Sequence, residues 1–239
     1  MGFSSSGIKG RAKEIIKTAK PSVIVAGMIY LALELVTTYL SQSVLTGKIS
    51  EHDAEQFLEA YTKKDFDYLM SFTARFQPTP SAWLINVAIS VVMLIVSAGF
   101  IIFIINTVRC TGAASYGNLL DGFGNAFKIV LLSFLEGLFI VLWSLLLIVP
   151  GFIAAYKYRQ AIYILLDNPE KSVMQCIKES KQMMAGHKWE LFGFDLSFLG
   201  WFLLGGIIPV VNIWVYPYTK TSYMLYYEYV RPLNRAETV

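Results

Sequence analysis

Charged residues, histidine and cysteine are all scarce in this sequence. Only 15% of its 239 residues are charged and 55% are hydrophobic, which is not the balance of a chain whose main solvent is water. The two cysteines, Cys110 and Cys176, have neither CxxC nor metal-ligand spacing, so we expect no disulfide framework. The formal charge of +3 is too small to indicate a nucleic-acid partner.

Catalytic motifs are missing as well. The patterns HExxH, GxSxG and the P-loop do not occur. His52 and His187 are the only histidines, and the topology predicted below places them on opposite sides of a membrane, which disfavours a shared metal site or proton relay. We therefore expect no enzyme, no metal and no cofactor.

Long hydrophobic runs stand where charge is lacking. Since a membrane span needs about 20 apolar residues, the sequence predicts an all-α bundle of six transmembrane helices in one membrane domain, 1–239. Pro150-Gly151 turns one tight hairpin between two of these helices. The run 151–167 is short, so it either crosses the membrane or is re-entrant. The six predicted spans are 22–44, 82–108, 126–149, 151–167, 189–206 and 209–230.

The distribution of lysine and arginine predicts the orientation. Both are concentrated in the leader 1–21, in the connection 168–187 and in the tail, so both termini should be cytoplasmic, with no removable signal peptide. Acidic residues outnumber basic ones in the connection 45–81, which is therefore expected outside. Helical spacing predicts two short helices there, forming either a lid over the outer mouth or a packed loop.

Two inner segments have the pattern of amphipathic helices. The leader 1–21 is expected to lie on anionic lipid or, alternatively, to be a solvated helix. The segment 168–187 is expected to begin at Asn168-Pro169 and to end at Gly186. It either docks a partner, which includes a second copy of the chain, or packs on its own bundle. The residues expected to meet anionic headgroups are Lys9, Arg11, Lys13, Lys17, Lys171, Lys178 and Lys181.

Charged residues inside the predicted spans are the most informative feature. Each costs about 2.5–3.5 kcal/mol at the centre of a span, so they should face inward and pair. Lys157 and Arg159 point to nearly opposite faces, so at most one of them should pair in the core. The set forms either structural glue or a ligand or ion pathway. Its members are Glu34, Glu136, Lys157, Arg159, Asp195 and Lys220.

Tyrosines crowd the last predicted span and its inner end. An aromatic belt at the membrane surface accounts for most of them. Tyr216, Tyr223 and Tyr227 fall near one helix face, however, and form a candidate lining for a polar cavity.

A set of short motifs in the second half of the chain is typical of a known family. They are Pro150-Gly151, Asp167-Asn168-Pro169, Glu179-Ser180-Lys181, Gly186-His187-Lys188-Trp189, Leu196-Ser197-Phe198 and Pro217-Tyr218. From the third span to its end, the chain resembles the bacterial integral membrane proteins grouped as domain of unknown function 975. The resemblance implies a multi-pass protein of the bacterial cytoplasmic membrane and implies no activity.

Three functions remain open from the sequence. The first is a non-enzymatic membrane protein that binds or transports a small or amphiphilic ligand, or serves as the membrane subunit of a complex. The second is a scaffold or regulator that engages anionic lipid or a partner protein, and the third is a lipid-processing enzyme. A water-accessible cavity that reaches Glu136 and Lys220 would favour transport, whereas a dry, fully paired core would favour a scaffold.

Overall fold

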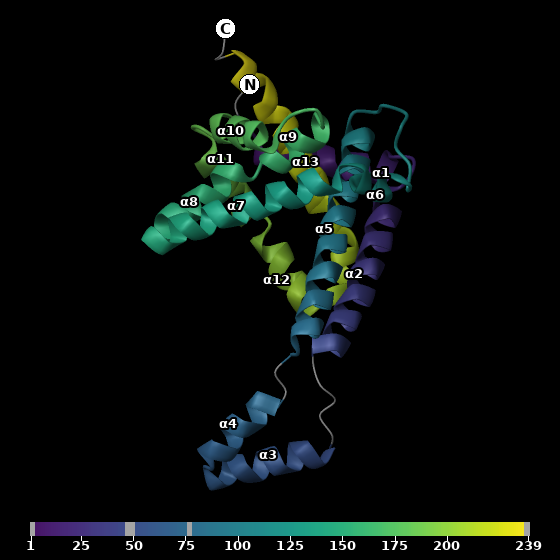
Figure 1. The fold of residues 1–239 in the computed structure, drawn as a ribbon. Helices are drawn as coiled ribbons and strands as arrows, with labels where there is room; N and C mark the ends of the chain where they lie inside the picture. Colours follow the sequence, from purple (N-terminus) through teal and green to yellow (C-terminus); the bar gives the residue numbers. More distant parts are fainter. Residues whose placement is uncertain (1–2, 46–50, 76–77, 237–239) are drawn as a thin grey trace. The chain divides into compact units, whose positions relative to one another are not determined.

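The computed structural model describes residues 3–45, 51–75 and 78–236, and every regular element in these ranges is a helix (Figure 1). The prediction of an all-α chain is confirmed for this part of the protein. The α-helices are α1 Ser5–Thr18, α2 Val23–Leu45, α3 Glu51–Lys63, α4 Phe66–Arg75, α5 Pro80–Val108, α6 Asn118–Asp121, α7 Ala126–Leu146, α8 Ile148–Tyr158, α9 Ala161–Asp167, α10 Val173–Met183, α11 Lys188–Leu196, α12 Leu199–Ile207 and α13 Asn212–Ala236. Two short 3-10 helices are η1 Gly122–Asn125 and η2 Pro209–Val211.

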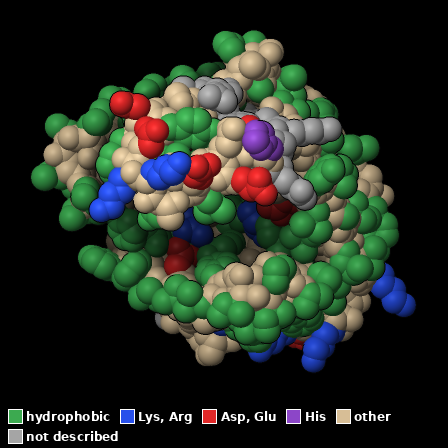
Figure 2. Space-filling view, turned by 90° about the horizontal axis from the view of Figure 1, so that it is seen from below, with side chains coloured by type: hydrophobic (Ala, Val, Ile, Leu, Met, Phe, Trp, Pro, Cys, Tyr) green, Lys and Arg blue, Asp and Glu red, His purple; other side chains and the backbone are tan. Residues whose placement is uncertain are grey.

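Fewer helices than expected are long and apolar enough to cross a membrane. Within the described residues there are three, Val23–Val44, Pro80–Val108 and Asn118–Leu146, or four if α11 and α12, bent by 40°, form one span. The six-span bundle and the orientation of its termini are therefore not confirmed. Hydrophobic side chains cover much of the face seen in Figure 2, as expected of a membrane protein.

The chain divides into two compact units, Ala32–Met93 and the remainder, Met1–Leu31 with Leu94–Val239. In the smaller unit, α3 and α4 pack against each other, with the rings of Phe57 and Phe72 5.0 Å apart. The Tyr68 hydroxyl donates to Gln56 across the same contact, at 2.7 Å. These are the two short helices predicted for the connection 45–81. Residues 46–50 and 76–77 of that connection lie outside the described residues.

In the larger unit, α13 is covered along one side by the leader helix α1. Ala12 and Ile16, on the apolar face of α1, are buried, and α1 makes most of its contacts with α13. The Lys9 ammonium donates to the carbonyl of Ser197 at 2.7 Å and lies 4.2 Å from the centre of the Phe198 ring. The apolar face that we expected to meet lipid is therefore occupied by the protein itself.

The helix expected at 168–187 also packs on its own chain. It begins at Ser172, not at Asn168, because the Ser172 hydroxyl and the Gln175 side chain form a reciprocal capping box. Val173, Cys176 and Met183 are buried on one side of α10. Its apolar face is thus already used within the larger unit, as in the second of the two interpretations given above.

Helices α7 and α8 pack against each other and form an apolar hairpin (Figure 1). A Cβ atom at Gly151 would lie 2.0 Å from the Ser144 Oγ, so the tight return of the chain requires glycine. The hairpin tip is exposed, and Ile148 keeps 86% of its accessible surface. In water such a surface would be costly, so the hairpin is suited to lipid.

The predicted span 151–167 is divided between two short helices, α8 and α9, and is not among the candidate spans of the described residues. The Phe152 ring lies 5.8 Å from that of Phe192, near the start of the fifth predicted span. A straight helix from Phe152 to Asp167 is roughly 22 Å long, so a full crossing would place Phe152 far from Phe192. The helical conformation is also interrupted by a turn at Arg159 and Gln160, between α8 and α9. The hairpin therefore remains beside the start of α11.

Close backbone contact fixes the segment after α5. A Cβ atom at Gly99 would lie 2.1 Å from the Leu119 carbonyl oxygen, and one at Gly122 would lie 2.3 Å from that of Ile95. Both distances are impossible for real atoms, so these two glycines allow α6 and η1 to lie directly on α5.

Replacing Gly99 by alanine should destabilise the fold. We expect Gly99→Ala to lower the free energy of unfolding by about 3 kcal/mol, because the new methyl group would force α6 away from α5. Thermal unfolding of the purified protein in a mild detergent measures this. The control is Gly137→Ala in α7, where a Cβ meets nothing within 4 Å. Equal melting temperatures for the two variants would contradict the packing described.

Candidate functional site

Asp195, near the end of α11, is the acceptor at the centre of a polar cluster. Its carboxylate accepts hydrogen bonds from the Tyr156 hydroxyl at 2.9 Å, from Arg159 Nη1 at 2.5 Å and from the Tyr223 hydroxyl at 2.8 Å. The Arg159 guanidinium also lies 4.6 Å from the centre of the Tyr223 ring. We call Tyr156, Arg159, Asp195 and Tyr223 the Asp195 cluster. It joins α8, α11 and α13.

The local sequence accounts for this arrangement. Tyr156 and Arg159 are three residues apart, so they share a face where α8 ends. Helix α8 ends next to Arg159, and α11 ends just after Asp195. A partly buried charge pair is stable only when its other hydrogen-bonding positions are filled, and the two tyrosine hydroxyls fill those of Asp195. The cluster thus lies where two helical segments are interrupted.

A second cluster surrounds Asp167 at the end of α9. Arg109 and Arg231 both pair with its carboxylate, and the Tyr227 hydroxyl donates to it at 3.1 Å. Arg109 Nε also donates to Glu228 at 2.7 Å. Only 5% of the Asp167 side chain is exposed. Burial raises the pKa of Asp167, but the hydrogen bond from Arg109 and the charges of both arginines outweigh burial and hold the pKa below its ordinary value.

One face of α13 serves both clusters. Tyr223, Tyr227 and Arg231 follow one another at intervals of four residues, so they lie along a single helix face. Tyr223 reaches Asp195, whereas Tyr227 and Arg231 reach Asp167. The Tyr163 ring stacks on that of Tyr227 with 5.6 Å between centroids. The two clusters are therefore neighbours along α13.

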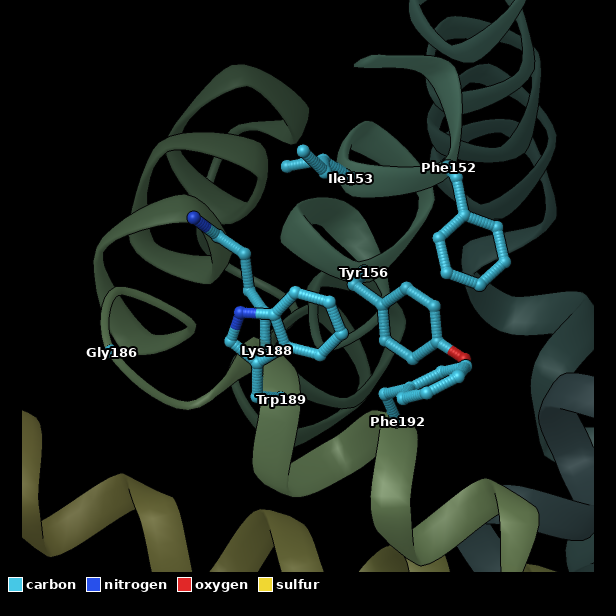
Figure 3. Close-up of a pocket in the computed structure, with 7 residues that line it drawn as sticks. All are labelled: Phe152, Ile153, Tyr156, Gly186, Lys188, Trp189 and Phe192. Atoms are coloured by element: carbon cyan, nitrogen blue, oxygen red, sulfur yellow. The ribbon is translucent and has the colours of Figure 1, made fainter. Parts of the chain in front are cut away.

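An open aromatic cavity of about 190 Å³ lies beside the Asp195 cluster (Figure 3). The ring centroids of Phe152 and Tyr156 are 5.1 Å apart, and those of Trp189 and Phe192 are 5.7 Å apart. Tyr156 belongs to both structures, since its ring lines the cavity and its hydroxyl bonds Asp195. The full lining is Phe152, Ile153, Tyr156, Gly186, Lys188, Trp189 and Phe192. We call it the aromatic cavity.

The charged residues singled out from the sequence are only partly brought together. Arg159 pairs with Asp195, as expected for buried charges. Lys157 does not share this pair, and its Nζ lies 5.4 Å from the centre of the Trp143 ring. Lys220 lies 5.4 Å from the centre of the Tyr216 ring.

The two remaining acids are not paired with these bases. Glu136 Oε1 is buried without a hydrogen-bond partner in the described part of the chain. Glu34 is exposed and lies in the smaller unit. A single balanced network of three acids and three bases is therefore not found among the described residues, because their depth in the spans does not determine which helix faces they occupy.

The tyrosines expected to line a polar cavity have separate roles. Tyr216 stacks on Tyr30 with 4.6 Å between centroids, whereas Tyr223 and Tyr227 bind the two aspartates. Tyr227 also lines a small cavity of about 100 Å³ with Lys171 and Arg231. Glu136 and Lys220 line neither this cavity nor the aromatic one.

The sequence interpretation did not predict that Arg109, Asp167 and Arg231 meet. All three stand at or just beyond the ends of predicted spans, where charged residues usually face water or headgroups. One signal in the sequence was available: Tyr223, Tyr227 and Arg231 are spaced by four residues, which places them on one face of a helix. Among the expected headgroup ligands, Lys171 is engaged by Glu179 at 2.6 Å. The described residues contain no group of three or more side chains suited to hold a metal ion.

The comparisons with known proteins give one match, to the C-terminal part of the chain. Residues 145–234 match the model of a family described as "Protein of unknown function (DUF975)". The resemblance is confirmed. The matched DUF975 region contains the aromatic cavity and all of the Asp195 cluster, whereas Arg109 lies outside it. No curated protein and no solved structure matches the chain.

The Asp167 cluster should make stability depend on acidity. Because the pKa of Asp167 is held below its ordinary value of 3.8, the folded protein binds a proton less readily than the unfolded one. The stabilisation should be complete above about pH 4 and should fall as the pH drops through the lower, folded pKa. Asp167→Asn should cost about 3 kcal/mol at neutral pH, at the lower end for a broken buried pair, because Arg109 keeps Glu228.

Melting temperatures in detergent between pH 7 and pH 3 measure both effects. Asp167→Asn should remove part of the acid dependence. Asp67→Asn in α4 removes an exposed carboxylate and serves as the control. If the two variants lose stability in parallel with the unmodified protein as the pH falls, Asp167 does not have the role assigned to it.

Proposed function

We propose that this chain is a non-enzymatic integral membrane protein that binds an amphiphilic ligand in the aromatic cavity. The observation that carries the proposal is the double position of Tyr156, whose ring lines the cavity while its hydroxyl bonds Asp195. Ligand sites are typically concave and apolar, with a few well-placed polar groups. A ligand that displaces the Tyr156 ring would also act on the Asp195 cluster.

The packing of the larger unit supports one arrangement in the membrane. We propose that the chain crosses in α2, in α5, in the broken pair α11–α12 and in α13, and that the α7–α8 hairpin dips into the bilayer from the inner side and returns. Tyr216 of α13 stacks on Tyr30 of α2 and on Phe100 of α5, which supports a common depth for these three helices. An even number of crossings keeps both termini cytoplasmic, as the basic residues favour.

This arrangement makes the site accessible from the inner leaflet. Trp189 lies in the first turn of α11 and is 78% exposed, a position typical of aromatic residues at a membrane surface. Under the proposed topology, the aromatic cavity lies at the border of headgroups and hydrocarbon. In the light of the DUF975 resemblance, the membrane concerned is the bacterial cytoplasmic membrane.

A second function is favoured by the exposed hairpin. Helix α7 keeps most of its apolar side chains exposed, and at the tip Leu145 and Ile148 are almost fully so. Such a surface suits lipid, and it also suits the membrane helix of a partner or a second copy of the chain. The alternative function is therefore that of a membrane subunit or scaffold in a larger assembly.

Cysteine labelling tests the topology. In a background of Cys110→Ser and Cys176→Ala, we expect Ile148→Cys at the hairpin tip to resist a membrane-impermeant maleimide added to intact cells. Val210→Cys, in the turn between α12 and α13, should react because it faces outside in either arrangement. The six-span arrangement would instead expose both positions. Labelling of Ile148→Cys from outside would therefore overturn the re-entrant hairpin.

Filling the aromatic cavity tests the proposed function. Ile153→Trp places a large ring in the cavity, and we expect at least a tenfold reduction in the amphiphiles that co-purify in mild detergent, measured by mass spectrometry of the intact protein. Leu203→Trp, at an exposed position of α12, is the matched control. Equal amounts of bound amphiphile in the unmodified protein and in both variants would refute the cavity as the binding site.

A further inference from the structure

The aromatic cavity has one lysine in its lining and two more lysines nearby. Lys188 lines it, and the positive charges of Lys188 and Lys181 both act on Lys157. Lys157 belongs to α8, Lys181 to α10 and Lys188 to α11. None of the three forms an ion pair with a carboxylate in the part of the chain that the structure describes. We call Lys157, Lys181 and Lys188 the lysine rim.

The lysines are brought together by a buried hydroxyl group. Ser180, which has no exposed surface, donates from its Oγ to the Lys157 carbonyl at 2.8 Å and accepts from the Gln160 amide at 3.2 Å. These bonds tie α10 to the end of α8, so Lys181 is held near Lys157. The Ser180 hydrogen bonds therefore fix the backbone position of Lys181 relative to Lys157.

Nearby acids do not neutralise this charge. Glu179 is engaged by Lys171 at 2.6 Å, and Glu190 is engaged by His187 at 2.8 Å. Asp195, behind Tyr156, is engaged by Arg159. The lysine rim thus combines an uncompensated positive charge with an adjoining apolar cavity. That combination matches a molecule with an anionic head and an apolar chain.

We infer that the ligand is an anionic membrane lipid whose phosphate binds the lysine rim and whose chain enters the aromatic cavity. This inference rests on the proposed function and adds the chemical class of the ligand. Lys188, Tyr156 and Trp189 all line the aromatic cavity, so a charged head and an apolar chain can bind side by side (Figure 3). Lysines at a membrane surface favour anionic lipid by about fivefold in affinity each.

Binding of single-chain lipids to the purified full-length protein tests the inference. The probes are lysophosphatidylglycerol, which is anionic, and lysophosphatidylcholine, which has no net charge. Native mass spectrometry should give the unmodified protein at least a tenfold preference for the anionic lipid. In the triple variant Lys157→Gln, Lys181→Gln and Lys188→Gln, the preference should fall to about twofold or less while binding of the uncharged lipid persists.

Matched variants distinguish the effect of charge at the lysine rim from that of charge elsewhere on the protein and from misfolding. Lys20→Gln, Lys63→Gln and Lys64→Gln remove the same charge from exposed positions elsewhere and should keep the preference. Lys188→Arg keeps the charge and should keep most of the preference for the anionic lipid. Single Lys188→Gln should show a partial loss if the triple variant does not fold. A preference that survives in every folded lysine-rim variant would overturn the inference.

Two further outcomes have distinct meanings. Inorganic phosphate at millimolar concentration should not displace the anionic lipid, and full displacement would show a phosphate site that needs no chain, which overturns the inference. If Ile153→Trp abolishes binding of both lipids while charge has no effect, the proposed function stands and the anionic class is wrong. If neither lipid binds to the unmodified protein, the proposed function itself fails and the inference with it.

Discussion

The hydrogen bond from the Tyr156 hydroxyl to Asp195 is the contact on which the site depends. It joins the end of α8 to α11, and through Asp195 it reaches Tyr223 on α13. The aromatic cavity exists only because α8 is held beside α11 at this level. The same contact keeps the α7–α8 hairpin next to the start of α11, so the site and the topology of the second half of the chain have one physical cause.

Helix α13 extends this principle along its length. Its tyrosines at 223 and 227 each bind a carboxylate that belongs to another helical segment, and Arg231 adds a charge at the next turn. Because the positions are four residues apart, a rotation of α13 about its axis would weaken both clusters together. Asp195 and Asp167 are therefore held by one face of the same helix.

The sequence predicts some of this structure and not the rest, for physical reasons. Apolar runs predict helices, and Pro150-Gly151 predicts the hairpin, since local chemistry determines both. Apolar length alone does not distinguish a full crossing from a hairpin that returns, which is why six predicted spans are not confirmed. Depth in a span likewise leaves the facing direction open, so Arg159 and Asp195 pair whereas Glu34 and Glu136 do not pair with the predicted bases.

The lysine at position 157 shows how environment assigns a role that sequence depth cannot. Considered as one charge in the middle of a predicted span, it requires an acidic partner. In the structure it lies at the last turn of α8, over the Trp143 ring and near two other lysines. A cation among cations is stable where water or an external anion supplies the compensating charge. Lys157 therefore belongs to a group of lysines of which Lys188 lines the aromatic cavity, and the surroundings of its side chain, not its depth in the sequence, decide this role.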